Sequence, residues 1–177
     1  ATASFGHGIT TTLLQLAKAY SIVVNGGYQI KPKLVKNNNN EKKEKILSQD
    51  LSREILPILR KIVSTKDGTA SLANVNGYEI GGKTGTAEKS ADGEYSNKKI
   101  NSFVSVFPTS KPKFVLAVML DEPKINENYI YHYRDGSNIK YKGTPFNTAG
   151  WTTVEATGQI VEKIGPILAT KYSEFNF

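Results

Sequence analysis

The segment "GGKTGTAEKS" at residues 81–90 combines residue types that can handle an acyl group beside a carboxylate. Lys83 provides a positive charge that can keep a nearby basic group deprotonated and attract an anionic substrate. The hydroxyls of Thr84 and Thr86 can donate hydrogen bonds to a substrate carboxylate, and the Thr86 amide could form part of an oxyanion hole. Gly85 has no Cβ, so a substrate backbone could lie directly against the chain. This pattern suits one wall of a serine acyl-transferase site.

A Lys-Thr-Gly tripeptide on its own is a weak signal. A glycine-rich edge strand with a solvated lysine would have the same sequence, so both interpretations stay open at this point. The choice depends on the elements around residues 81–90.

Three segments repeat apolar residues at helical spacing, and three others read as strands. The predicted helices cover "TTLLQLAKAYSIVV", "LSREILPILRKIV" and "TTVEATGQIVEKIGPIL". Pro57 lies inside the second helix and is expected to kink it or to delay its start. The predicted strands are "GYEIGGKTGTAEK", "NSFVSVF" and "KFVLAVML", with "ADGEYSN" as a loop after the first. The sequence therefore predicts an α+β fold in which helices cover an antiparallel sheet of three strands.

Two further segments are expected to lie outside this core. Residues 36–45 form a polar, low-complexity loop. Residues 124–148 contain alternating tyrosines up to Asp135-Gly136, which predicts a hairpin inserted between the last strand and the last helix.

The composition argues against a membrane-spanning segment, a metal or cofactor site and a nucleic-acid partner. The 177 residues are 38% hydrophobic, enough for one core, and no apolar run is long enough to span a membrane. The chain has no cysteine and only two histidines, so we expect no metal site and no cofactor. The net charge of +7 is dispersed along the chain, so nucleic acid is not an expected partner.

Four stretches in the same order resemble class B penicillin-binding proteins. The first, "SFGHGITTTLLQLAKAYSIVVNGGYQIKPKLV", resembles the segment after that family's Ser-x-Asn motif. The second, "GTASLANVNGYEIGGKTGTAEK", contains the family's third motif as Lys83-Thr84-Gly85-Thr86. "INSFVSVFPTSKPKFVLAVMLDEPK" is similar to the next two strands and "AGWTTVEATGQIVEKIGPIL" to the closing helix, with Glu155 where the family usually has proline. The resemblance covers residues 4–122, resumes at 149, and is closest to the cell-division transpeptidases.

This resemblance implies a partial penicillin-binding, serine transpeptidase fold, with residues 1–177 as the C-terminal portion of the domain. It implies a peptidoglycan D,D-transpeptidase, in which a serine attacks the D-Ala-D-Ala terminus of a stem peptide and β-lactams trap that serine. It further implies an N-terminal anchor in the inner membrane, a periplasmic catalytic domain and partners in the division complex. By the same resemblance, Lys83, Thr84, Gly85 and Thr86 bind the substrate, Lys83 assists catalysis, and Tyr95 borders the cleft.

The family's nucleophile motif, Ser-x-x-Lys, has no acceptable counterpart in the chain, and Ser-x-Asn is absent. The spacing occurs at Ser96-Asn97-Lys98-Lys99, which we reject because it follows the Lys-Thr-Gly segment and lies in an expected polar loop. We therefore expect the nucleophile to lie upstream of residue 1, the fragment alone to be inactive, and the strand near Phe114 to Leu120 to have an unpaired edge.

Two other classes of function remain as alternatives. One is a D,D-carboxypeptidase or β-lactamase-like hydrolase, which shares the third motif. The other is a non-catalytic penicilloyl-receptor or scaffold domain.

Overall fold

The computed structural model describes residues 9–35, 43–91, 94–143 and 146–172. Its centre is an antiparallel sheet of three strands, β1 (Gly81–Ala91), β2 (Glu94–Phe107) and β3 (Phe114–Asp121), in the order β1-β2-β3. Lys83 pairs with Val104, which in turn pairs with Ala117. The three strands thus form the expected meander, with β1 and β3 as its two edges.

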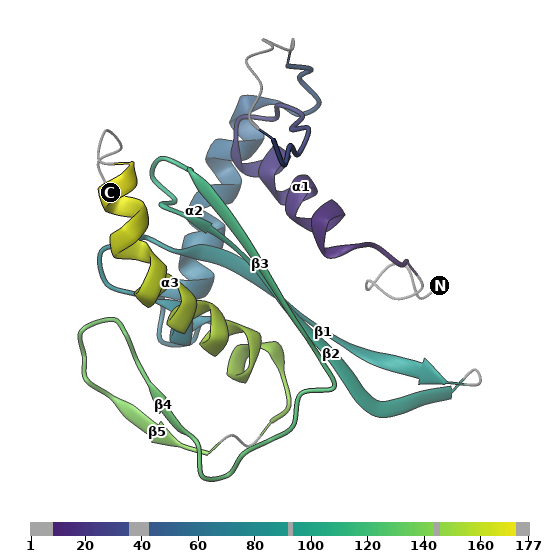
Figure 1. Ribbon diagram of the computed structural model, residues 1–177, viewed down its shortest axis with the longest axis vertical. Coiled ribbons are helices and arrows are strands. Elements are labelled where there is room, and N and C mark those ends of the chain that lie inside the picture. Colours follow the sequence, from purple (N-terminus) through teal and green to yellow (C-terminus); the bar gives the residue numbers. More distant parts are fainter. Residues whose placement is uncertain (1–8, 36–42, 92–93, 144–145, 173–177) are drawn as a thin grey trace.

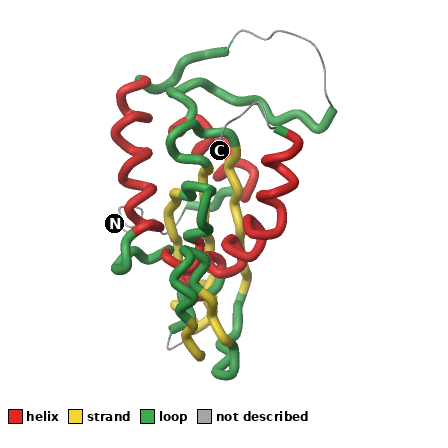
Figure 2. The backbone as a smooth tube through the Cα atoms, turned by 90° about the vertical axis from the view of Figure 1, so that its left-hand side faces the viewer, coloured by secondary structure: helices red, strands yellow, loops and turns green. Residues whose placement is uncertain are grey.

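Helices cover both faces of this sheet (Figure 1). α1 (Leu13–Val24) and α2 (Gln49–Ser64) contact each other and pack on one face, whereas α3 (Thr153–Lys171) packs on the other. Figure 2 shows the strands lying between helices on either side. The predicted α+β fold is therefore confirmed.

Successive side chains of β2 point to opposite faces of the sheet, so the hydrophobic core consists of two clusters, one on each face. Phe103 and Phe107 are fully buried in a large cluster with Val154 and Val161 of α3. Val106 points the other way, into a smaller cluster with residues of α1 and α2. A strand with apolar side chains on both faces is what a covered sheet requires.

Each of the first two helices begins at a side-chain cap. Thr12 and Gln15 form a reciprocal capping box at the start of α1, and the Ser48 hydroxyl accepts a hydrogen bond from the Leu51 amide at the start of α2. α2 runs from Gln49 through Pro57 without a break, so the predicted delay of its start is wrong. Pro57 and Arg53 both lie on the exposed side, where water can satisfy the Arg53 carbonyl that Pro57 cannot bond.

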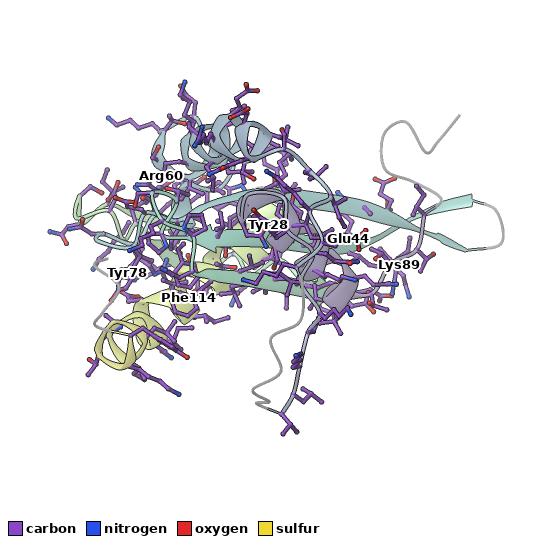
Figure 3. All side chains as sticks on the ribbon, turned by 90° about the horizontal axis from the view of Figure 1, so that it is seen from above. Tyr28, Glu44, Arg60, Tyr78, Lys89 and Phe114 are labelled. Carbon is purple, nitrogen blue, oxygen red and sulfur yellow. The ribbon has the colours of Figure 1, made fainter. Side chains whose placement is uncertain are left out.

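β1 begins and ends later than predicted, and β2 is longer than predicted. β1 continues to Ala91 and β2 begins at Glu94, so most of the expected "ADGEYSN" loop is strand; residues 92–93 lie outside the described part. The pairing of β1 with β2 shifts between Glu88 and Ser90. Beyond this shift the two strands project away from the helices as an arm (Figures 1 and 3), with the labelled Lys89 near its base.

A second, small sheet lies within residues 124–148. β4 (Ile130–His132) pairs antiparallel with β5 (Lys140–Lys142), and Gly136 between them has a φ of 89°. The described residues also contain two short 3-10 helices, η2 (Ser71–Ala73) before β1 and η3 (Ala149–Trp151) before α3. Of the expected polar loop, residues 36–42 lie outside the described part, and Lys45 at its end pairs with Tyr28.

Candidate active site

The Lys83–Thr86 segment lies in the middle of β1, and its side chains alternate between the two faces of the sheet. Lys83 and Gly85 are on the face covered by α1 and α2. Thr84 and Thr86 are on the face covered by α3. Among the described strands β1 pairs only with β2, so its other edge is unpaired.

Lys83 lies at a hollow of about 320 Å³ between the sheet and the first two helices. Its side chain is exposed, and its Nζ donates a hydrogen bond of 2.9 Å to the Thr84 carbonyl. Tyr20 of α1 also lines the hollow, and burial raises the pKa of its hydroxyl. The described lining contains no serine: its other members are Ala19, Val23, Ile55 and Leu59.

The two threonines each contact a separate backbone segment. The hydroxyls of Thr84 and Thr69 lie 3.3 Å apart, within hydrogen-bond distance. The Oγ1 of Thr86 accepts a hydrogen bond of 3.0 Å from the Ala149 amide at the start of η3. The sequence did not identify Thr69 or Ala149 as part of the site, although both lie in stretches that carry the family resemblance.

Gly85 is opposite Ser102 of β2. A Cβ at residue 85 would come within 2.7 Å of the Ser102 hydroxyl oxygen and within 4 Å of no other described atom beyond its neighbours. Because that oxygen is at the end of a rotatable side chain, packing alone does not require glycine here. Gly82 differs, since a Cβ there would contact the Val104 carbonyl and the Phe103 ring.

A buried polar network supports β2 directly opposite Thr86. Asn101 pairs with Thr86 in the sheet and is fully buried. Its Nδ2 donates to Asn147 Oδ1 at 3.0 Å and to Thr152 Oγ1 at 2.9 Å. An asparagine in the apolar strand "INSFV" was the only sequence signal for this network.

The structure places every Ser-x-x-Lys spacing of the described chain outside a helix. Ser96–Lys99 lies on β2 and not in a polar loop, because β2 extends further than expected. The same spacing also occurs at Ser110–Lys113, in a loop, and at Ser137–Lys140, which runs from a loop into the first residue of β5. None of these can present a serine and a lysine on one helical turn, as the family's motif does. Tyr95 is on β2, but its side chain lies outside the described part.

Two other kinds of site are absent from the described residues. No group of three or more metal-ligating acidic or histidine side chains occurs there. None of the helices described is both long and apolar enough to cross a membrane.

Residues 1–139 match the model of the penicillin binding protein transpeptidase domain. The chain belongs to this transpeptidase family. It is 33% identical to a probable peptidoglycan D,D-transpeptidase FtsI of Caulobacter vibrioides, over 97% of this chain and 28% of that protein. It is 37% identical to the stage V sporulation protein D of Bacillus subtilis, over 70% of this chain and 21% of that protein.

Solved structures agree with this assignment. The transpeptidase domain of penicillin-binding protein 3 from Burkholderia pseudomallei superposes with a TM-score of 0.74 and 29% identity, over 97% of this chain and 46% of that chain. The predicted membership in this family is therefore confirmed. The chain spans less than a third of the two curated relatives and about half of the solved domain.

Proposed function

We propose that this chain is the C-terminal portion of a serine-type peptidoglycan D,D-transpeptidase and provides the substrate-binding wall of its active site. The observation that carries the proposal is the arrangement on β1. An exposed lysine faces one side of the strand, two threonine hydroxyls face the other, and the outer edge of the strand is unpaired. An extended peptide can bind along such an edge by backbone hydrogen bonds.

In this proposal each residue of the segment has one role. The Thr84 and Thr86 hydroxyls bind the carboxylate at the D-Ala-D-Ala terminus. Gly85 lets the donor backbone approach the strand, and the Thr86 amide stabilises the oxyanion. Lys83, on the other face, provides the positive charge near the nucleophile and its lysine base.

The reaction requires a serine and a lysine from outside residues 1–177. The serine oxygen attacks the carbonyl of the penultimate D-Ala while its proton passes to the lysine. The peptide bond breaks, that proton goes to the departing D-Ala amine, and an acyl-serine remains. The amine of a second stem peptide then attacks the ester, loses a proton and restores the serine. A β-lactam would enter as a donor mimic whose acyl-serine persists.

The place of this reaction follows from the same proposal. Peptidoglycan lies outside the inner membrane, so the catalytic domain would be periplasmic and anchored by a segment upstream of residue 1. The Caulobacter relative carries the name FtsI. A role in division with other division proteins as partners is the corresponding expectation.

The test is labelled-penicillin acylation of the intact gene product and its Lys83→Ala variant. Loss of one electrostatic group at such a site costs about 3–4 kcal/mol, so acylation should slow by two to three orders of magnitude. Lys89→Ala is the matched control, because Lys89 is on the same strand but pairs with Asp121 and Glu122 at the arm. It should acylate at nearly the wild-type rate. Equal rates for all three proteins would show that β1 is not the wall of the active site.

Product analysis separates the proposal from its alternatives. A transpeptidase transfers the acyl group to an added D-amino acid or stem-peptide amine, whereas a carboxypeptidase or β-lactamase releases it to water. A penicilloyl receptor would acylate without turning over a peptide donor.

A further inference from the structure

The hairpin of β4 and β5 is attached to α3 by a buried ion pair. Arg134 donates to both carboxylate oxygens of Glu155, at 2.8 and 2.9 Å, and each side chain is only 6% exposed. Burial alone would lower the pKa of Arg134, but hydrogen bonds and charge from Glu155 outweigh it and raise that pKa. Arg134 also donates to the Leu72 carbonyl and lies against Gly158, where a Cβ would come within 3.2 Å of its Nη1. A bidentate pair with its donors satisfied holds the hairpin in one position.

The same hairpin fixes η3. The ring of Trp151, the last residue of η3, contacts Tyr131 of β4 at 5.1 Å and Tyr141 of β5 at 5.2 Å between centroids. η3 is thus held by both strands of the hairpin and by α3, which follows it directly. Ala149 at its start is 1% exposed.

The hydrogen bond from the Ala149 amide limits the directions in which the Thr86 hydroxyl can donate its own hydrogen bond. A hydroxyl has one proton to donate and two lone pairs to accept with. One lone pair of Thr86 Oγ1 is occupied by the Ala149 N–H at 3.0 Å, so the O–H bond must point away from η3. Thr86 is an exposed residue, so a ligand can reach its hydroxyl.

We propose that the Ala149 amide, held by the Arg134–Glu155 clamp through η3, is a positioning group that directs the Thr86 hydroxyl toward a substrate carboxylate. This inference rests on the proposed function, in which Thr86 binds that carboxylate. It assigns a role in substrate selection to the hairpin, which has no direct contact with Lys83–Thr86 among the hydrogen bonds of the described chain.

The test compares two thioester donor peptides on the intact gene product, one ending in a carboxylate and one in the corresponding carboxamide. Ala149→Pro removes the amide proton and puts the ring Cδ in its place beside Thr86 Oγ1, at the first residue of a helical turn where proline is tolerated. Thr148 before it is already extended (φ −130°, ψ 162°). The preference for the carboxylate donor should fall about tenfold, as for losing one hydrogen bond to a charged group. Ala149→Gly and Ala149→Val keep the amide and should keep the wild-type preference, even where both rates fall.

The outcomes separate the two proposals. No acylation of the wild-type protein by the carboxylate donor would refute the proposed function itself. A wild-type preference retained in Ala149→Pro would overturn the positioning role alone. Should Ala149→Pro fail to fold, the double variant Arg134→Met/Glu155→Leu removes the clamp without leaving a buried charge. A several-fold loss of the preference in that variant supports the inference, and an unchanged preference overturns it.

Discussion

The two faces of the sheet differ in how completely they are covered. On the α3 face, Val154, Val161 and Phe103 are fully buried, and polar side chains are joined in bonded networks. On the other face, Val24 is the only buried residue of α1, while Leu14 is 63% exposed. The strand of the candidate site contributes to both faces: its threonines to the first and its lysine to the second.

This difference separates two halves of the candidate site. In the half that would bind a carboxylate, Thr84 and Thr86 are each within hydrogen-bond distance of another segment of this chain. The half that would activate a nucleophile, around Lys83, borders a hollow with no serine in its described lining. The exposed apolar side chains of α1 and the hollow without a serine thus lie on the same face of the sheet. This supports the proposal that residues upstream of residue 1 cover that face and supply the nucleophile.

The largest effect on stability is expected on the α3 face. Glu155→Leu would leave the buried Arg134 with only the largely exposed Glu162 as a counter-ion, and loss of the buried partner of such a pair typically costs about 3–5 kcal/mol. Chemical denaturation of the purified chain measures this loss. As a control, Glu162→Leu removes a second, largely exposed partner of Arg134 and should cost less than about 1 kcal/mol. Similar losses for both variants would contradict the view that the Arg134–Glu155 pair holds this face together.

Gly85→Val tests why residue 85 is glycine: whether to leave space for a bound substrate or to allow the strand to pack. The variant should melt within a few degrees of wild type, because valine suits a strand and the only close contact is the Ser102 hydroxyl. Penicillin acylation of the intact protein should nevertheless be lost.

Ser102→Ala, combined with Gly85→Val, removes the one steric conflict and serves as the control. Acylation should remain lost in the double variant. Recovery of the wild-type rate there would mean that the valine acts by displacing Ser102 and that no substrate lies against residue 85.

The same valine-to-alanine substitution on each face of the sheet compares how much apolar burial contributes to stability there. Val161→Ala in α3 removes fully buried methyl groups and should cost about 2 kcal/mol. Val23→Ala in α1 makes the same change at a half-buried position and should cost less than about 1 kcal/mol in residues 1–177. Equal unfolding free energies for the two variants would remove the contrast between the faces.

The smallest effect is expected at Leu14. In residues 1–177 alone, Leu14→Ser should change stability by less than about 0.5 kcal/mol, because the side chain is already 63% exposed. In the intact gene product the same change should lower the melting temperature by several degrees if upstream residues cover α1. No shift in the intact protein would mean that this side of α1 faces solvent there as well.

Local patterns in the sequence were sufficient to predict most of the fold. Periodic apolar residues identified the three α-helices of the described chain, and the alternation in "NSFVSVF" gave the correct faces of β2. The errors arose where long-range pairing overrides local signals. Polar residues near Tyr95 read as a loop, yet pairing between β1 and β2 extends both strands through them.

The site was only partly predictable for a related reason. Motif order identified Lys83–Thr86, but hydrogen bonds between distant segments cannot be read from spacing. Thr86 and Ala149 are 63 residues apart in sequence. Glu155 stood out as a departure from the family's usual proline, but its partner Arg134 gave no sequence signal because it lies in the hairpin, where the resemblance is interrupted.

The most direct test of the central claim is mass spectrometry after incubation with a labelled penicillin, on residues 1–177 and on the intact gene product in parallel. The claim is that the substrate-binding wall lies in residues 1–177 and the nucleophile lies outside them. We predict no covalent adduct on residues 1–177, and one adduct per intact molecule on a serine upstream of Ala1. A stable, stoichiometric adduct on the isolated chain, whether on Ser96 or any other residue, would contradict this account.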